Sequence, residues 1–191
     1  MNFYDELELI QRKQNDIFEI QKKVTGYFEG KKLMPYKDTV GKWTIGIGHN
    51  FDDNGFEKSH EDMIRKRLND YITPIKNLVI EKGIIDEECS EIFRHDIKVA
   101  EKDARRLVSN FGSLNIYRQI ALIDFSFNVG YNVFFDFKNT RKFIEQGNFY
   151  EAANGFKNSK WYKQVRRRGP IICDIIKNGK FSDQFMKSAG I

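Results

Sequence analysis

The segment Asp38–His49, DTVGKWTIGIGH, places three of the chain's 14 glycines within twelve residues. Its Ile-Gly alternation is typical of a strand, yet glycine weakens a strand interior because it packs nothing and loses much backbone entropy. On a strand, Thr44, Gly46 and Gly48 would share one face, while the two isoleucines would pack inward on the other. The glycine face therefore predicts a bare floor on which a polymer could lie, with the Thr44 hydroxyl able to hold a water molecule.

Around this segment the periodicity alternates between extended and helical. Residues 33–51 contain two short extended runs around the turn signal Asp-Thr-Val-Gly, which predicts a hairpin. Upstream, apolar residues recur at three- and four-residue intervals, which predicts a helix over residues 5–32 that ends near Gly30. Downstream, Ser59 and Asp62 resemble a capping box that opens a helix with Tyr71 and Ile72 on its inner face.

The second half of the chain carries helical patterns. A long helix is expected over residues 86–107, and a buried central helix over 115–130, where the sequence is apolar almost all round. Shorter helices are expected at 140–147, 149–156 and 171–178. The predicted fold class is α+β and mostly helical, with a small hairpin-bearing lobe joined to a larger helical lobe. A cleft between two such lobes is a usual place for a ligand.

Composition narrows the function classes. The 191 residues suit one globular domain, and a hydrophobic content of 40% excludes a disordered chain. A net charge of +5 favours an anionic partner, such as nucleic acid, an acidic membrane face or a cell-wall polymer. Cys89 and Cys173 lie far apart without metal-binding spacing, so we expect buried thiols and no metal or other cofactor. The sequence predicts no stable membrane insertion and no secretory leader, so we expect synthesis in a cytoplasm.

Three polar residues close together in sequence could do chemistry: Glu29 at a helix end, Asp38 at a turn and Thr44 on the next strand. Two carboxyl groups across a cleft suit hydrolysis of a glycosidic bond, one donating a proton and the other serving the opposite face of the sugar. Burial beside Phe28 and Tyr27 would favour a protonated Glu29, and the polar turn an ionised Asp38. Spacing alone leaves the alternative open, because many soluble proteins carry such a pair and threonine is a common strand residue.

The stretch FEGKKLMPYKDTVGKWTIGIGHN closely resembles the active-site segment of phage-type (T4-like) lysozymes, a family of glycoside hydrolases. The family pattern is Glu-Gly, then Tyr-x-Asp-x-x-Gly, then Thr-x-Gly-x-Gly-His, and every element is present between Glu29 and His49. The segments RQIALIDFSFNVG and NTRKFIEQGNFYEAANGFKNSKWY also resemble the family, and the likeness covers about residues 25–180. It implies a two-lobed lysozyme-like fold and a muramidase that cleaves the β-1,4 bond between N-acetylmuramic acid and N-acetylglucosamine in peptidoglycan, causing bacterial cell lysis.

The resemblance also implies residue roles. Glu29 would be the general acid, and Asp38 with Thr44 would position the attacking water in an inverting reaction, for which the carboxyl groups lie about 6.5–9.5 Å apart. One of the arginines 166–168 would pair with the glutamate, and Arg168 fits best. His49 would pair with Asp96 and stabilise the fold. The positions that would line the substrate cleft are Phe127 and Thr140, for which core and helix-surface roles are equally open.

The expected organisation is one lysozyme domain over residues 1–191. Its parts are a helical extension without an assigned role (1–20), a small lobe (about 21–85), a connecting helix (about 86–108) and a helical lobe (about 109–191). The expected partner is the peptidoglycan glycan strand, met by a monomer in the periplasm after a holin or equivalent releases it. The first alternative is a non-catalytic lysozyme-like binder of glycan or partner. The second, a nucleic-acid binder suggested by the arginine run, lacks a recognition motif, so no nucleic acid is expected.

Overall fold

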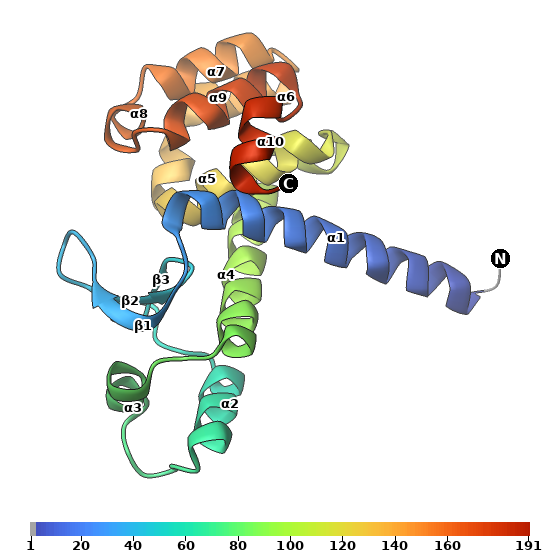
Figure 1. Ribbon diagram of the computed structural model, residues 1–191. Helices are drawn as coiled ribbons and strands as arrows, with labels where there is room; N and C mark the ends of the chain where they lie inside the picture. Colours follow the sequence, from blue (N-terminus) through green and yellow to red (C-terminus); the bar gives the residue numbers. More distant parts are fainter. Residues whose placement is uncertain (1–2) are drawn as a thin grey trace. The chain divides into compact units, whose positions relative to one another are not determined.

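The structure is a computed structural model that describes the backbone of residues 3–191 and the side chains of residues 14–191. This part of the chain is mostly helical with one small antiparallel sheet, which confirms the predicted fold class (Figure 1). The elements in chain order are α1 (Phe3–Glu29), β1 (Lys32–Lys37), β2 (Trp43–Gly46), β3 (His49–Asn50), α2 (Lys58–Leu68), α3 (Ile75–Lys82), α4 (Asp86–Leu107), the 3-10 turn η1 (Phe111–Ser113), α5 (Ile116–Asp136), α6 (Lys138–Glu145), α7 (Phe149–Lys157), α8 (Lys160–Gln164), α9 (Arg168–Asn178) and α10 (Asp183–Ala189).

The chain divides into two compact units. The sheet unit, Glu29–Asp96, holds the three strands, α2, α3 and the beginning of α4. The helical unit comprises Ile97–Ile191 together with α1 as far as Phe28. Glu29 is therefore the last residue of α1 and the first residue of the sheet unit.

The sheet unit is built on the order β1-β2-β3, with both pairs antiparallel. The turn between β1 and β2 lies at the predicted Asp-Thr-Val-Gly signal, and Tyr36 of β1 faces Thr44 of β2 in the register. Helix α3 packs against β1, and the amide of Ile84 donates to the carbonyl of Leu33 at 2.9 Å. The core of this unit consists of buried apolar side chains: Ile45, Ile47, Phe51, Ile64, Leu78, Val79, Ile84, Cys89, Ile92 and Phe93.

The strand predicted to continue through Gly48 ends at Gly46, because the chain turns at Ile47–Gly48 into β3. Gly46 and Gly48 have φ of +65° and +74°, a left-handed backbone conformation that residues other than glycine rarely adopt. A Cβ atom on Gly46 would lie 3.2 Å from the Cys89 sulfur, so this glycine faces buried side chains. The predicted bare floor is therefore wrong, and the glycines build a tight turn.

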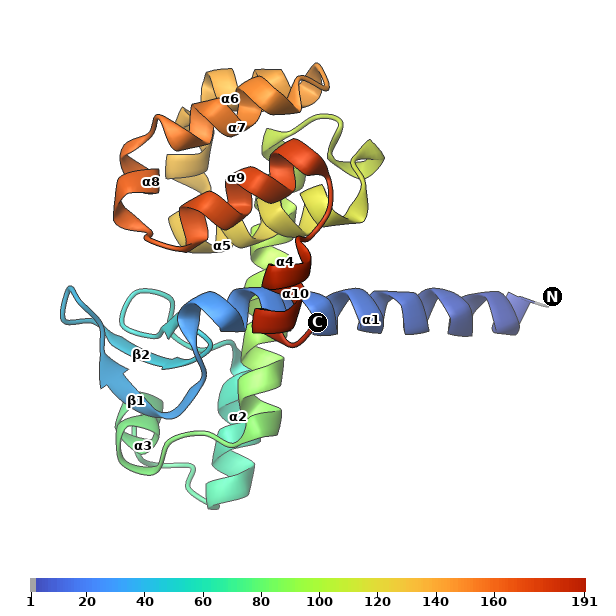
Figure 2. The ribbon, with the colours of Figure 1, turned by 45° about the horizontal axis from the view of Figure 1, so that its top comes forward.

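The helical unit is centred on α5, whose residues 120–126 are all buried. The Phe125 ring meets Phe134, Phe156 and Trp161 edge-on, with ring centroids 4.7–5.0 Å apart. Such edge contacts are favoured between aromatic rings. Helix α7 packs against α6 and α9, and α9 against α5, a grouping that Figures 1 and 2 both show. This core explains the phenylalanine-rich composition of the second half of the chain.

Several predicted helix boundaries hold. Helix α4 spans the predicted residues, and α5 breaks at Gly130, whose φ of 73° and ψ of 170° are not helical. The chain then resumes as a helix to Asp136, which was not predicted. The pattern also missed α3, α8 and α10, which are short elements whose positions depend on tertiary packing more than on periodicity.

The start and end of α2 differ from the prediction. The capping box is wrong, because the helix begins at Lys58 and its N-cap residue makes no side-chain cap hydrogen bond. The helix ends at Leu68, followed by Asn69 in a left-handed conformation. Tyr71 and Ile72 lie beyond this end and are 65% and 95% exposed, so their predicted place on an inner face is also wrong.

Three further observations bear on the predictions. The expected N-terminal extension, residues 1–20, is helical from Phe3 in α1, while residues 1–2 and the side chains of 3–13 lie outside the described residues. Cys89 and Cys173 form no disulfide, and Cys89 is buried as expected, whereas Cys173 is only partly buried. Burial raises the pKa of Cys173 to about 11. Among the described helices, none combines the length and apolar character needed to cross a membrane.

Candidate active site

Glu29 stands where α1 ends and the sheet unit begins, and its half-buried side chain packs against the β2–β3 turn. A Cβ atom on Gly48 would lie 3.1 Å from Cγ, 3.2 Å from Cδ and 3.3 Å from Oε2 of Glu29. Gly48 is therefore required twice, by its positive φ and by the close approach of this carboxyl group. The glycine at position 48 makes room for a carboxylic acid of the chain itself.

Asp38 is fixed by the turn between β1 and β2. Its Oδ1 accepts hydrogen bonds from the amides of Val40 at 2.9 Å and Lys42 at 2.8 Å. Its own amide donates to the carbonyl of Lys42 at 2.9 Å, and its carbonyl accepts from the amide of Gly41 at 3.1 Å. An aspartate that bonds to nearby amides in this way is typical of a tight turn and holds the carboxyl group in one orientation.

Thr44 lies on β2 and is 4% exposed. Its hydroxyl donates to the carbonyl of Lys42 at 3.4 Å, which is long for an O–H···O hydrogen bond. A stronger partner, such as a water molecule, can therefore take this hydroxyl at little cost.

Tyr36 joins the predicted residues electrostatically, although the sequence identified it only as a motif position. Burial raises the pKa of its phenol, and the negative charges of Glu29 and then Asp38 raise it further. Tyr36 is also the register partner of Thr44 in the β1–β2 pair.

His49 and Asp96 are in contact, as the resemblance implied. His49 is buried, and its Nδ1 lies 2.8 Å from Oδ2 of Asp96, while its Nε2 lies 2.8 Å from the carbonyl oxygen of Gly55. Both partners are acceptors, so a ring that donates to both is an imidazolium. Burial lowers the pKa of His49, but the hydrogen bond and charge of Asp96 and the Gly55 carbonyl outweigh burial and raise it. A stabilising role stays a prediction.

The arginine run occupies the turn before α9 and the first residue of that helix. Arg168 is 5% exposed, and its Nε donates to Oδ2 of Asp124 at 3.1 Å. Arg167 donates to the backbone carbonyl of Tyr27, and Arg166 has a left-handed φ of 43°. The pairing of Arg168 with Glu29 stays a prediction.

Phe127 and Thr140 both belong to the helical unit. Phe127 is half-buried on α5. Thr140 is 4% exposed, and its hydroxyl packs so closely on α7 that a Cβ atom on Gly155 would collide with it. This packing favours a structural role for Thr140, while the substrate-binding role of both residues stays a prediction.

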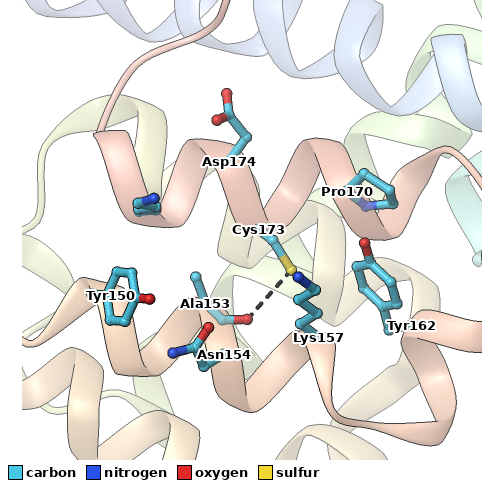
Figure 3. A pocket seen from close by; sticks show the side chains of 9 residues that line it. Tyr150, Ala153, Asn154, Lys157, Tyr162, Pro170, Cys173 and Asp174 are labelled. Carbon is cyan, nitrogen blue, oxygen red and sulfur yellow. Dashed lines mark hydrogen bonds between the residues drawn. The ribbon is translucent and has the colours of Figure 1, made fainter.

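The helical unit also carries a groove of about 290 Å³ between α7 and α9. Figure 3 shows Tyr150 and Tyr162 on its walls and the sulfur of Cys173 directed at the carbonyl of Ala153, 3.5 Å away. None of the predicted catalytic or substrate-binding residues lines this groove. Within the part of the chain that the structure describes, no three histidine, cysteine or carboxylate side chains are grouped to hold a metal ion.

Comparison with known proteins gives consistent matches. The family profile described as Phage lysozyme matches residues 26–172. The chain is 34% identical to probable T4-type lysozyme 1 of Dictyostelium discoideum over 160 residues, 80% of this chain and 91% of that protein. It is 31% identical to probable T4-type lysozyme 2 of the same organism over 161 residues, 82% and 93% of the two chains. The chain is also 27% identical to the pre-baseplate central spike protein Gp5 of Enterobacteria phage T4 over 157 residues. This match covers 79% of this chain and 26% of that protein.

Proposed function

Because the chain belongs to the phage lysozyme family, we propose that it is a peptidoglycan muramidase, hydrolysing the β-1,4 bond between N-acetylmuramic acid and N-acetylglucosamine. Family membership and the names of the relatives make it a glycoside hydrolase of the lysozyme type. The observation that carries the proposal is the packing of the Glu29 carboxyl group against Gly48, within a motif whose every element is present from Glu29 to His49. Two carboxyl groups held in fixed orientations are what glycosidic hydrolysis requires.

In the proposed reaction Glu29 is the general acid. It donates its proton to the glycosidic oxygen as the bond to the anomeric carbon breaks, so the leaving sugar departs as an alcohol. The positive charge that develops on the sugar ring makes it reactive toward water. A carboxyl group that delivers a proton must be held along one direction, and the backbone of Gly48 supports Glu29 from one side.

Asp38 and Thr44 are assigned to the attacking water. Asp38 accepts both of its amide hydrogen bonds at Oδ1, and we assign Oδ2 to take the proton from the water. The Thr44 hydroxyl, weakly held by the Lys42 carbonyl, orients that water. Attack from the face opposite the acid inverts the configuration at the anomeric carbon. For this reaction we expect the carboxyl groups of Glu29 and Asp38 to lie about 6.5–9.5 Å apart.

The test compares the wild-type protein with Glu29→Gln on outer-membrane-permeabilised Gram-negative cells, followed as loss of turbidity. The amide keeps the shape of the side chain but has no acidic proton, so we expect at least about a hundredfold loss of rate. Mass analysis of the released muropeptides should show reducing muramic acid ends and no 1,6-anhydro form. Equal rates for the two proteins would contradict the assignment of the acid, and binding of glycan without turnover would favour a non-catalytic binder.

A further inference from the structure

A hydrogen-bond network of buried polar side chains joins α1, α5 and α9 within the helical unit. The amide nitrogen of Gln21 donates to the Thr25 hydroxyl at 3.1 Å, and that hydroxyl donates to Oδ1 of Asp124 at 2.9 Å. Arg168 donates through Nε to Oδ2 of the same carboxyl group at 3.1 Å. The four residues are 1%, 0%, 0% and 5% exposed in the order Gln21, Thr25, Asp124 and Arg168.

Asp124 is the centre of this hydrogen-bond network because each of its two oxygens accepts a hydrogen bond from a different helix. Burying a charged carboxylate is costly unless an opposite charge and further hydrogen bonds compensate it. Here Arg168 supplies the charge and Thr25 supplies the second donor. The network therefore fixes α1 and the first residue of α9 to the centre of α5, and removal of any member leaves the others poorly satisfied.

The same arginine segment holds the end of α1 from the other direction. The last carbonyls of a helix lack partners within the helix, and basic side chains there are favourable. Arg167 donates to the carbonyl of Tyr27, and its guanidinium lies 4.1 Å from the centroid of the Tyr27 ring. Arg168 lies 4.7 Å from the centroid of the Phe28 ring. Phe185 of α10 also packs on both rings, and Figures 1 and 2 both show α10 against α1.

We propose that Asp124 is a positioning residue for the catalytic acid, acting through Thr25 and Arg168. Glu29 directly follows Phe28 and lies four residues after Thr25, on the same side of α1. A rigid last turn therefore fixes the direction in which the Glu29 side chain leaves the helix. This assignment rests on the proposed function, since it gives Glu29 a catalytic task, but the clamp on α1 is independent of that task.

The experiment uses Asp124→Asn in the full chain. In asparagine an NH2 group replaces one of the two carboxylate oxygens, so one of the two donors, the Thr25 hydroxyl or Arg168 Nε, would face another donor, and the negative charge opposite Arg168 is lost. A displacement of about 1 Å at a reacting group can cost about a hundredfold in rate. We expect kcat on soluble glycan strands to fall at least tenfold while KM changes less than twofold, by the same scaling. Hydrogen exchange of the amides at residues 26–30 should accelerate in the variant.

The matched control is Glu88→Gln in the sheet unit. Glu88 is 1% exposed and accepts hydrogen bonds from Arg67 at 2.7 and 3.0 Å. The Glu88→Gln variant therefore loses a buried acceptor opposite an arginine, as Asp124→Asn does. Its kcat should equal that of the wild type once folded protein is counted by near-UV circular dichroism. The proposal is overturned if both variants lose kcat equally, or if exchange at 26–30 does not change. An inactive wild-type protein whose Asp124→Asn variant still exchanges faster would refute the proposed function and leave the clamp supported.

Discussion

Gly48→Ala tests whether the glycine of the β2–β3 turn is there for the backbone alone or for the acid. The added methyl group would lie 3.1 Å from Cγ and 3.2 Å from Cδ of Glu29, closer than ordinary carbon contacts. It also places an L side chain at a φ of +74°, which costs about 1–2 kcal/mol. For a chain of this size, that cost lowers the melting temperature by about 2–8 °C.

The second effect of Gly48→Ala concerns catalysis. To relieve the contact, the Glu29 carboxyl group must move by about 0.3–0.5 Å, and a displacement of about 1 Å can cost about a hundredfold. If the loss scales with displacement, kcat falls about four- to tenfold. The matched control is Gly147→Ala, because Gly147 has a φ of +72° and nothing within 4 Å of its Cβ position.

The assay is lysis of permeabilised cells at a temperature where both variants are fully folded, with melting followed by circular dichroism. Both variants should lose similar stability, since the backbone cost is the same. Only Gly48→Ala should lose activity per folded molecule. If Gly48→Ala keeps the activity of Gly147→Ala, then the contact with Glu29 does not matter for function, and the turn alone explains the glycine.

Two further predictions concern pH and salt. His49 has its pKa raised in the folded protein, mainly because Asp96 outweighs burial, so its stabilisation is complete below the unfolded pKa near 6.5 and is lost as pH rises through the folded value. The stability difference between the wild type and His49→Gln, measured by urea unfolding, should therefore shrink between pH 5.5 and 8.5; a constant difference would contradict the charged pair. The net charge of +5 should attract the protein to anionic cell envelopes, so lysis should slow as salt rises from low ionic strength to about 0.15 M, where the screening length is about 8 Å; salt-independent lysis would remove that role for the charge.

Much of the fold could be predicted because long periodic segments determine their own structure. Asp86 and the apolar residues that follow it located α4, and Gly130 was predicted to end the central helix, where α5 in fact breaks and then resumes. The hairpin turn at Asp38 carried a local signal as well. Local chemistry was misleading where two structures share one pattern. Alternating Ile-Gly fits both a strand and a two-residue turn, and only the positive φ of Gly46 and Gly48 separates them.

The motif predicts which residues form the candidate site, but it gives no signal for the contacts that hold them. The motif singled out Glu29 and Asp38, because a family motif consists of residue types at fixed spacing and can be recognised in the sequence alone. No such motif indicates the role proposed for Asp124, since an acidic residue in an apolar helix is predicted to be exposed until its partners are known. Those partners, Thr25 and Arg168, lie 99 and 44 residues away, and sequence periodicity does not report pairs of that separation.

Two groups of contacts bear on Glu29, one at the last turn of its helix and one at its carboxyl group. Its backbone continues a helix whose last turn is fixed in the helical unit by Asp124 and the neighbouring arginines. Its carboxyl group packs against Gly48, within the sheet unit. A general acid needs both kinds of support, because the helix end sets where the side chain starts and the turn limits where its proton can point. The spacing between the glutamate and the glycine in the motif then has a physical reason: it is the length of chain needed to leave α1, form one hairpin and bring a residue without a side chain back to the acid.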